Sequence, residues 1–134
     1  MKNILIIDDN PDDLEFYTDL IRQADENYRV YKASDFIEGM DIFERYRIDC
    51  TFLDYNLPEM NGLMILEVMN RRSNGEIPPV VILTGESNHA IEHEAVKHGA
   101  MDFLIKNITH NTPDQINTII RKVTKWNDSP NTPH

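Results

Sequence analysis

Residues 4–13 decide the fold, and they read Ile4-Leu5-Ile6-Ile7-Asp8-Asp9-Asn10-Pro11-Asp12-Asp13. Four consecutive apolar residues that end abruptly in acids are typical of a strand buried on both faces of a parallel sheet. A helix is then expected, because Asn10 can cap it and Pro11 suits its first position. The acids Asp12 and Asp13 favour the positive end of its dipole. The stretch therefore predicts one strand followed directly by one helix.

The same order of an apolar run and an amphipathic stretch recurs four more times. Further strands are predicted over residues 28–33, 49–53, 80–83 and 101–105. Further helices are predicted from a capping box at Asp35 and Glu38, after Gly62, from about Ala90 to Lys97, and from a second capping box at Thr112 and Gln115. Alternating strands and helices predict the α/β class, with a parallel sheet covered by helices on both faces.

Length and composition fit one globular domain. The chain has 134 residues, of which 40% are hydrophobic and 27% charged. We expect the domain to cover residues 1–126 and residues 127–134 to form a polar tail. The formal net charge of −10 disfavours direct contact with nucleic acid, whose phosphates would be repelled.

Cysteine use and the apolar runs bear on the compartment. Cys50 is the only cysteine, so an internal disulfide is impossible and a reducing compartment is expected. The apolar run at residues 4–7 is far too short for a signal sequence or a membrane span. We therefore expect a cytoplasmic protein without membrane insertion.

Four of the five predicted strands end in polar residues of a particular kind, namely Asp8-Asp9, Asp54, Thr84 and Lys106. The carboxyl ends of parallel strands meet at one edge of a sheet, where ligands bind, so these side chains are expected to converge. Three carboxylates there would repel one another unless a cation intervened, and Mg²⁺ commonly binds one or two carboxylates together with phosphate. A carboxylate can also attack phosphorus to give an aspartyl phosphate. The convergence predicts a phosphoryl-transfer site.

The motifs that carry this chemistry resemble a known family. They are Ile7-Asp8-Asp9-Asn10, Leu53-Asp54-Tyr55-Asn56-Leu57-Pro58-Glu59-Met60-Asn61-Gly62, Leu83-Thr84-Gly85, and Gly99-Ala100-Met101-Asp102-Phe103-Leu104-Ile105-Lys106. With them the sequence resembles the receiver domains of two-component response regulators from Lys2 to about Trp126. The resemblance implies a doubly wound, CheY-like or flavodoxin-like fold, in which five helices flank a five-stranded parallel sheet of order 2-1-3-4-5.

The resemblance also implies roles for residues around the acceptor. Asp54 would be the phosphoacceptor. Mg²⁺, or Mn²⁺ in its place, would be held by Asp9, Asp54 and the backbone carbonyl of Asn56, while Asp8 would act mainly through metal-bound water.

The remaining implied roles concern the phosphoryl oxygens and the switch. Lys106 would pair with the phosphoryl oxygens, and Thr84 would hydrogen-bond to them once the group is attached. Gly85 would leave room for the phosphodonor because it lacks a side chain. Phe103 occupies the aromatic switch position, whose ring orientation is coupled to the movement of Thr84.

By the same resemblance the protein would be a signalling switch rather than an enzyme, although it would assist its own phosphorylation and dephosphorylation. The donor would be a phosphohistidine on a sensor histidine kinase or a histidine phosphotransfer protein. The face formed by the fourth helix, fifth strand and fifth helix would present the signal to a downstream protein that the sequence does not identify.

Two departures from the family pattern lie beside that face. Proline usually follows the family's lysine, often after a cis peptide bond, but here Asn107 follows Lys106, so a trans bond is expected. The segment 107–111 is also long for the connection to the last helix. An unusual partner or readout is the resulting hypothesis.

Three alternatives differ from the switch. A flavodoxin-like electron carrier would need a phosphate-binding first loop, but residues 8–13 are acidic and would repel phosphate. A haloacid-dehalogenase-type phosphatase would need an acid two residues after its nucleophile, where Asn56 stands. A phosphorylation-independent receiver that binds its partner constitutively remains open. Such a receiver would usually lack some of the five key residues, all of which are present here; they are Asp8, Asp9, Asp54, Thr84 and Lys106.

Overall fold

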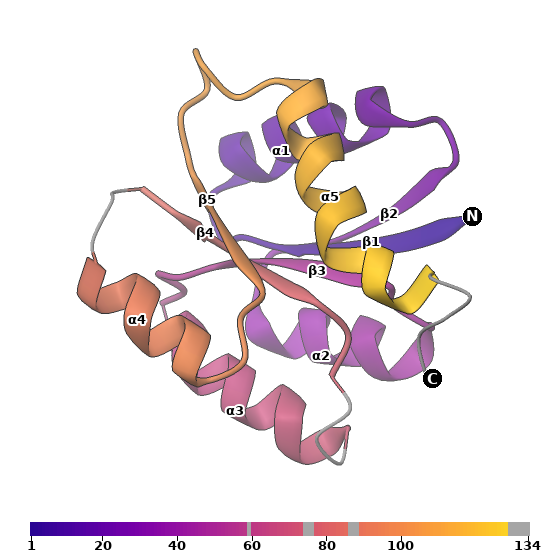
Figure 1. The fold of residues 1–134 in the computed structure, drawn as a ribbon. Coiled ribbons are helices and arrows are strands. Elements are labelled where there is room, and N and C mark those ends of the chain that lie inside the picture. Colours follow the sequence, from indigo (N-terminus) through magenta and orange to yellow (C-terminus); the bar gives the residue numbers. More distant parts are fainter. Residues whose placement is uncertain (59, 74–76, 86–88, 129–134) are drawn as a thin grey trace.

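A computed structural model describes residues 1–58, 60–73, 77–85 and 89–128, with backbone alone for 125–128. Strands and helices alternate along the chain, as predicted (Figure 1). The elements are β1 (Lys2–Ile7), α1 (Pro11–Ala24), β2 (Tyr28–Ala33), α2 (Phe36–Arg45), β3 (Cys50–Asp54), α3 (Gly62–Arg72), β4 (Val80–Thr84), α4 (His89–Lys97), β5 (Asp102–Ile105) and α5 (Pro113–Asp128).

The five strands form one parallel sheet in the order β2-β1-β3-β4-β5, which confirms the predicted fold class and strand order. Two strands, β3 and β4, end one residue later than predicted. Asp54 still pairs with Leu83, and Thr84 still pairs with Ile105, so both polar residues belong to the last position of their strands. Their backbones are therefore fixed by the sheet.

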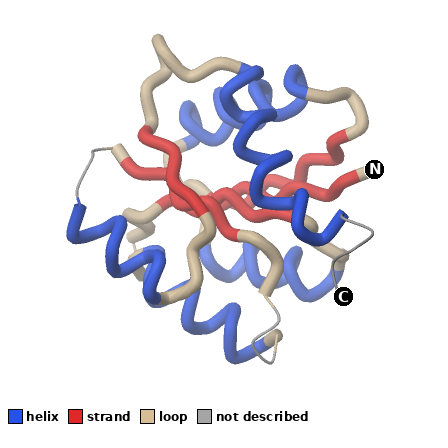
Figure 2. Tube along the Cα trace, in the orientation of Figure 1, coloured by secondary structure: helices blue, strands red, loops and turns tan. Residues whose placement is uncertain are grey.

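The helices cover both faces of the sheet, as Figures 1 and 2 show. On one face, α1 and α5 lie over a core that includes Ile4, Tyr17 and Ile120. On the other face, α2, α3 and α4 lie over a core that includes Leu5, Leu53 and Ile82. Successive strand residues face opposite sides, and every residue of the runs Ile4–Ile7 and Val80–Leu83 is buried. Burial on both sides explains why these runs are continuously apolar.

Capping side chains begin the helices where the sequence predicts. Asn10 Oδ1 accepts from the backbone N–H groups of Asp12 and Asp13 at 3.0 and 3.1 Å, which fixes the start of α1. At α5, the Gln115 N–H donates to Thr112 Oγ1 at 3.1 Å. The Gln115 side chain does not close the predicted capping box, because its Oε1 accepts from Asn111 Nδ2 at 2.9 Å instead. The loop before α5 is thus tied to the helix.

Two further features concern membrane spans and the C-terminal end of the chain. Within the described part of the chain, no helix combines the length and apolarity that crossing a membrane would require. The last helix, α5, runs to Asp128, and residues 129–134 of the predicted tail lie outside the described residues. The tail stays a prediction.

Candidate functional site

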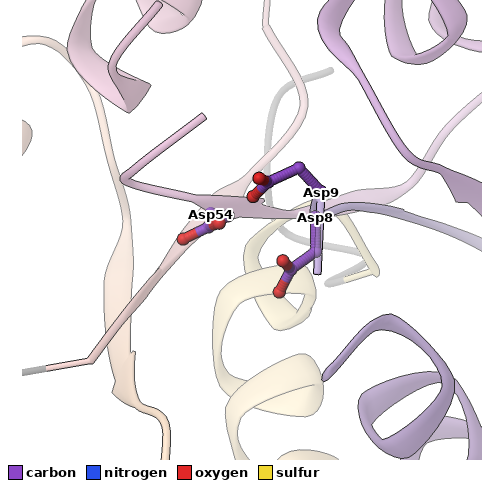
Figure 3. Close-up of side chains that lie close together, drawn as sticks. All are labelled: Asp8, Asp9 and Asp54. Atoms are coloured by element: carbon purple, nitrogen blue, oxygen red, sulfur yellow. The ribbon is translucent and has the colours of Figure 1, made fainter. Parts of the chain in front are cut away.

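Three carboxylates meet at the carboxyl edge of the sheet. Asp8 and Asp9 follow β1, Asp54 ends β3, and these two strands are neighbours. One carboxylate oxygen of each lies within 4.8 Å of the others, and Figure 3 shows the three side chains gathered there. The predicted convergence is therefore confirmed for these three residues.

The acids differ in their exposure. Asp8 has no exposed surface and Asp54 retains 5%, whereas Asp9 is exposed. The pKa of the Asp54 carboxyl is raised to about 6: burial is the largest cause and the nearby Asp8 charge adds to it, while the Lys106 ammonium and the Asn56 N–H act in the opposite direction. The Asn56 N–H donates to Asp54 Oδ1 at 3.2 Å. A buried, poorly neutralised carboxylate at a ligand-binding edge is a candidate for function.

Lys106 places its ammonium among three carboxylates. Its Nζ lies 2.6 Å from Asp8 Oδ2, 3.2 Å from Asp13 Oδ2 and 3.5 Å from Asp54 Oδ1. Burial alone would lower the pKa of Lys106, but hydrogen bonding to Asp8 and the charges of Asp54 and Asp8 hold the pKa above its ordinary value. Lys106 is therefore a fixed cation beside the predicted acceptor.

The ends of β4 and β5 are joined beside the site. The Lys106 N–H donates to the Thr84 carbonyl at 2.8 Å, and Thr84 is buried. Gly85, which follows Thr84, is exposed, and a Cβ placed there would meet no described heavy atom within 4 Å. The role of Gly85 toward a phosphodonor stays a prediction.

Phe103 lies in β5 and is half-buried against the core under α2, α3 and α4. Its N–H donates to Asp102 Oδ1 at 2.8 Å. Its place in β5, three residues before Lys106, is the one expected. Its switching role stays a prediction, as does the role of the Asn56 carbonyl.

A polar network holds the loop that follows Lys106. The Asn107 N–H donates to the Tyr17 hydroxyl at 2.9 Å and to Asn111 Oδ1 at 2.8 Å, and the Tyr17 hydroxyl donates to Asn111 Oδ1 at 2.6 Å. No peptide bond among the described residues is cis, so the expected trans bond after Lys106 is confirmed. The Asn107 N–H, which a proline would lack, is the donor that ties this loop to α1.

Two residues of this neighbourhood were not predicted as part of the site. Asp13 was predicted only as an acid that favours the helix dipole, and Tyr17 was given no role at the site. Their spacing carried a signal, because Asp13 and Tyr17 are four residues apart and so share one face at the start of α1. That face points toward the strand end that carries Lys106, as the contacts of Asp13 and Tyr17 show.

The carboxylates suit a hard divalent cation. Mg²⁺ and Mn²⁺ prefer oxygen ligands, and Asp8, Asp9 and Asp54 offer three within a small space. Lys106 supplies a single positive charge against them, and the pKa of Asp54 stays raised, first by burial and then by the Asp8 charge. The acidic cluster could therefore bind a metal ion.

Comparison with known proteins supports one family. A family model described as a response regulator receiver domain matches residues 4–121. The chain is 33% identical over 106 residues to a probable cyclic di-GMP phosphodiesterase of Vibrio cholerae serotype O1. The matched stretch covers 79% of this chain and 23% of that protein. Among the other curated relatives compared, the chain spans 28% to 53% of their length.

Solved structures agree on the fold. A response regulator receiver domain protein from Clostridium thermocellum superposes with a TM-score of 0.82 at 26% identity, covering 96% of this chain and 98% of that one. The receiver domain of a sensor histidine kinase from Pseudomonas aeruginosa PAO1 superposes with a TM-score of 0.78 at 23% identity, covering 92% and 98%. That structure has a magnesium ion coordinated in its active-site cleft.

Proposed function

The chain belongs to the response regulator receiver domain family, and from that membership we propose that it accepts a phosphoryl group on Asp54 from a phosphohistidine of a partner protein. The partner would be a sensor histidine kinase or a histidine phosphotransfer protein. The modified chain would then signal to a downstream protein. In this role the chain is an acceptor that assists its own modification and is not itself a turnover enzyme.

The placement of Lys106, Asp8 and Asp9 around Asp54 is the observation that supports this proposal most directly. The Lys106 ammonium lies 3.5 Å from Asp54 Oδ1, and Asp8 and Asp9 lie within 4.8 Å. Phosphoryl transfer needs positioning and charge neutralisation more than it needs acid–base catalysis. This arrangement supports both needs around one nucleophilic oxygen.

The transfer itself balances without a further reactant. A carboxylate oxygen of Asp54 forms a bond to phosphorus as the bond between phosphorus and the donor's histidine nitrogen breaks. The electron pair of that bond stays on the imidazole, which takes up a proton from solvent. Lys106 holds positive charge beside the oxygens of the transferred group, and Thr84 donates its hydroxyl hydrogen to one of them.

A divalent cation, Mg²⁺ or Mn²⁺, fits the acidic cluster. Asp9, Asp54 and the Asn56 carbonyl would hold it, with Asp8 acting through bound water. When bound, the ion would neutralise negative charge on the acids and on the phosphoryl oxygens. Asp54 would then be ionised, as a nucleophile must be.

The output is proposed to pass through α4, β5 and α5. Thr84 and Lys106 are hydrogen-bonded through their backbones, so a ligand that draws both inward acts on β4 and β5 together. Large apolar side chains are exposed on and beside this face; they are Val96, Met101, Ile105 and Ile108. A face of this kind suits contact with another protein, whose affinity for the two states would set the switch.

The test is modification by a small phosphodonor in the presence of Mg²⁺. We expect a mass increase of one phosphoryl group on the unsubstituted chain and none on Asp54→Asn. Beryllofluoride with Mg²⁺, as a phosphoryl mimic, should shift the amide resonances of β4 and β5. Retained modification of Asp54→Asn would refute the acceptor assignment, and an unmodified but folded parent chain would favour the phosphorylation-independent receiver.

A further inference from the structure

Lys106 forms an ion pair with Asp13, a residue that the proposed reaction does not need. Asp13 comes from α1 rather than from a strand end, and it is absent from the acidic triad of Asp8, Asp9 and Asp54. Its Oδ2 nevertheless lies 3.2 Å from Lys106 Nζ and accepts a hydrogen bond from it. An acid that shares the key cation of a phosphoryl site needs a separate explanation.

The backbone of Asp13 is fixed by the start of α1. Its N–H donates to Asn10 Oδ1 at 3.1 Å, and the Asn10 N–H in turn donates to Asp8 Oδ1 at 3.0 Å. The cap therefore ties Asp13 to the same strand end that carries the first partner of Lys106. The contact between Asp13 and Lys106 thus joins the first turn of α1 to the residue that directly follows β5.

The partners of Lys106 differ in how easily each can be released. Asp8 is completely buried, so without Lys106 its charge would face neither water nor a counter-ion. Asp54 is the acceptor and would itself carry the phosphoryl group. Asp13 has 28% of its side chain exposed, so water can solvate its charge once the ammonium moves away. Asp13 is thus the partner that Lys106 can leave at the lowest free-energy cost.

We propose that Asp13 is an exchangeable counter-ion, which holds Lys106 in the unphosphorylated chain and surrenders it to the phosphoryl oxygens. This inference rests on the proposed function. A Lys ammonium has three donors, and here three carboxylates already engage it. A phosphoryl group on Asp54 competes for one of these donors, so Asp13 weakens the phosphorylated state and makes it shorter-lived. Asp13 is in this sense a positioning residue for Lys106.

The neighbouring residue supplies a matched control. Asp12 precedes Asp13 in the first turn of α1, is exposed, and stands equally near the positive end of the helix dipole. Asp12→Asn and Asp13→Asn therefore remove the same charge from the same turn. Only Asp13→Asn removes the carboxylate that Lys106 contacts.

The first experiment measures beryllofluoride affinity at saturating Mg²⁺. Asp13→Asn should bind about fivefold tighter than the parent chain, as expected for release of a partly exposed ion pair, and Asp12→Asn should change by less than about twofold. The effect of Asp13→Asn should vanish in a Lys106→Met background. Equal effects of the two Asn variants, or an effect that survives Lys106→Met, would show general charge repulsion and overturn the proposal.

A second experiment does not depend on phosphoryl chemistry. Thermal unfolding in EDTA compares the parent chain, Asp13→Asn, Lys106→Met and the double variant, and we expect the two destabilisations to be less than additive by a few degrees in Tm. Additive Tm shifts would show that Asp13 and Lys106 do not stabilise each other and would overturn the proposal. If Lys106→Met does not fold, the comparison of Asp13→Asn with Asp12→Asn decides.

The two proposals fail in different ways. A folded parent chain that binds no beryllofluoride with Mg²⁺ would refute the proposed function and, with it, the exchange. Normal binding by the parent chain and unchanged binding by Asp13→Asn would refute the exchange alone.

Discussion

Replacing the proposed acceptor Asp54 with its neutral isostere Asn should stabilise the metal-free protein at neutral pH. Asp54 is buried, accepts from the Asn56 N–H, and lies near Asp8, and its pKa is raised to about 6, first by burial and then by the Asp8 charge. An Asp in the unfolded chain has a pKa of about 3.9. The folded state therefore binds the Asp54 proton more tightly than the unfolded state does, and ionisation of Asp54 opposes folding.

The magnitude follows from the two pKa values. Moving the pKa from its ordinary 3.8 to about 6 corresponds to about 3 kcal/mol at about 1.36 kcal/mol per pH unit. Stability from protonated Asp54 is fully present below about pH 3.9 and is lost as pH rises through about 6. Asp54→Asn carries no such charge, so above pH 7 it should unfold about 10 °C higher than the parent chain, taking about 3–4 °C per kcal/mol for this size.

The assay is thermal unfolding followed by circular dichroism in EDTA between pH 4 and pH 8. The difference in Tm between Asp54→Asn and the parent should be small at pH 4, grow through pH 6 and level off above pH 7. Asp12→Asn controls for the general loss of one acid and should show no such rise. A gap that does not change with pH, or an Asp54→Asn variant less stable than the parent at pH 8, would refute the reasoning.

Further outcomes follow from the same geometry. Asp9→Asn should weaken Mg²⁺ binding, measured by calorimetry, by about 10-fold or more, because Asp9 belongs to the acidic cluster. Because Asp9 is exposed, its replacement should leave Tm in EDTA within about 1 °C of the parent value. Undiminished Mg²⁺ binding would show that Asp9 is not a metal ligand. Gly85→Ala should leave stability within about 0.5 kcal/mol, since its Cβ meets no described heavy atom within 4 Å, but should slow phosphorylation by a protein donor. An equally fast reaction would show that the donor does not approach Gly85. Tyr17→Phe should cost about 1–3 kcal/mol in urea unfolding and weaken beryllofluoride binding, because it removes the Asn107 link beside Lys106. Tyr28→Phe, which loses a 2.6 Å hydrogen bond to Asn117 away from the site, should lower stability without weakening beryllofluoride binding. Equal loss of beryllofluoride binding in both Tyr variants would show that Tyr17 does not help to position Lys106.

The fold could be predicted almost completely because each local signal agrees with the global arrangement. The continuous apolar runs at residues 4–7 and 80–83 are buried on both faces, as parallel strands covered by helices must be. Strand ends were less predictable. The third strand was expected over 49–53 but runs from Cys50 to Asp54, because pairing with β4 continues through a polar residue that the apolar pattern excludes.

The site was predictable where it depends on strand ends and was missed where it depends on a helix face. Asp8, Asp9 and Asp54 could be brought together from the topology alone, since the ends of neighbouring parallel strands coincide. Asp13 could not, because an acid in the first turn of a helix already has a sufficient explanation in the helix dipole. Only the position of the Lys106 ammonium distinguishes Asp13 from its exposed neighbour Asp12.

The residue after Lys106 shows how a departure from the family pattern is accommodated. A proline there would fix the backbone through its ring, but it would also remove the N–H that Asn107 donates to Tyr17 and Asn111. The chain thus replaces a ring constraint by hydrogen bonds to α1, the helix that also supplies Asp13. Asp13 contacts the Lys106 ammonium, and Tyr17, one turn later on α1, accepts from the next backbone N–H. Both contacts join α1 to the segment that would move if Lys106 shifted toward a phosphoryl group. Under the proposed function, we therefore expect α1 to contribute to the response to phosphorylation, together with the face formed by α4, β5 and α5.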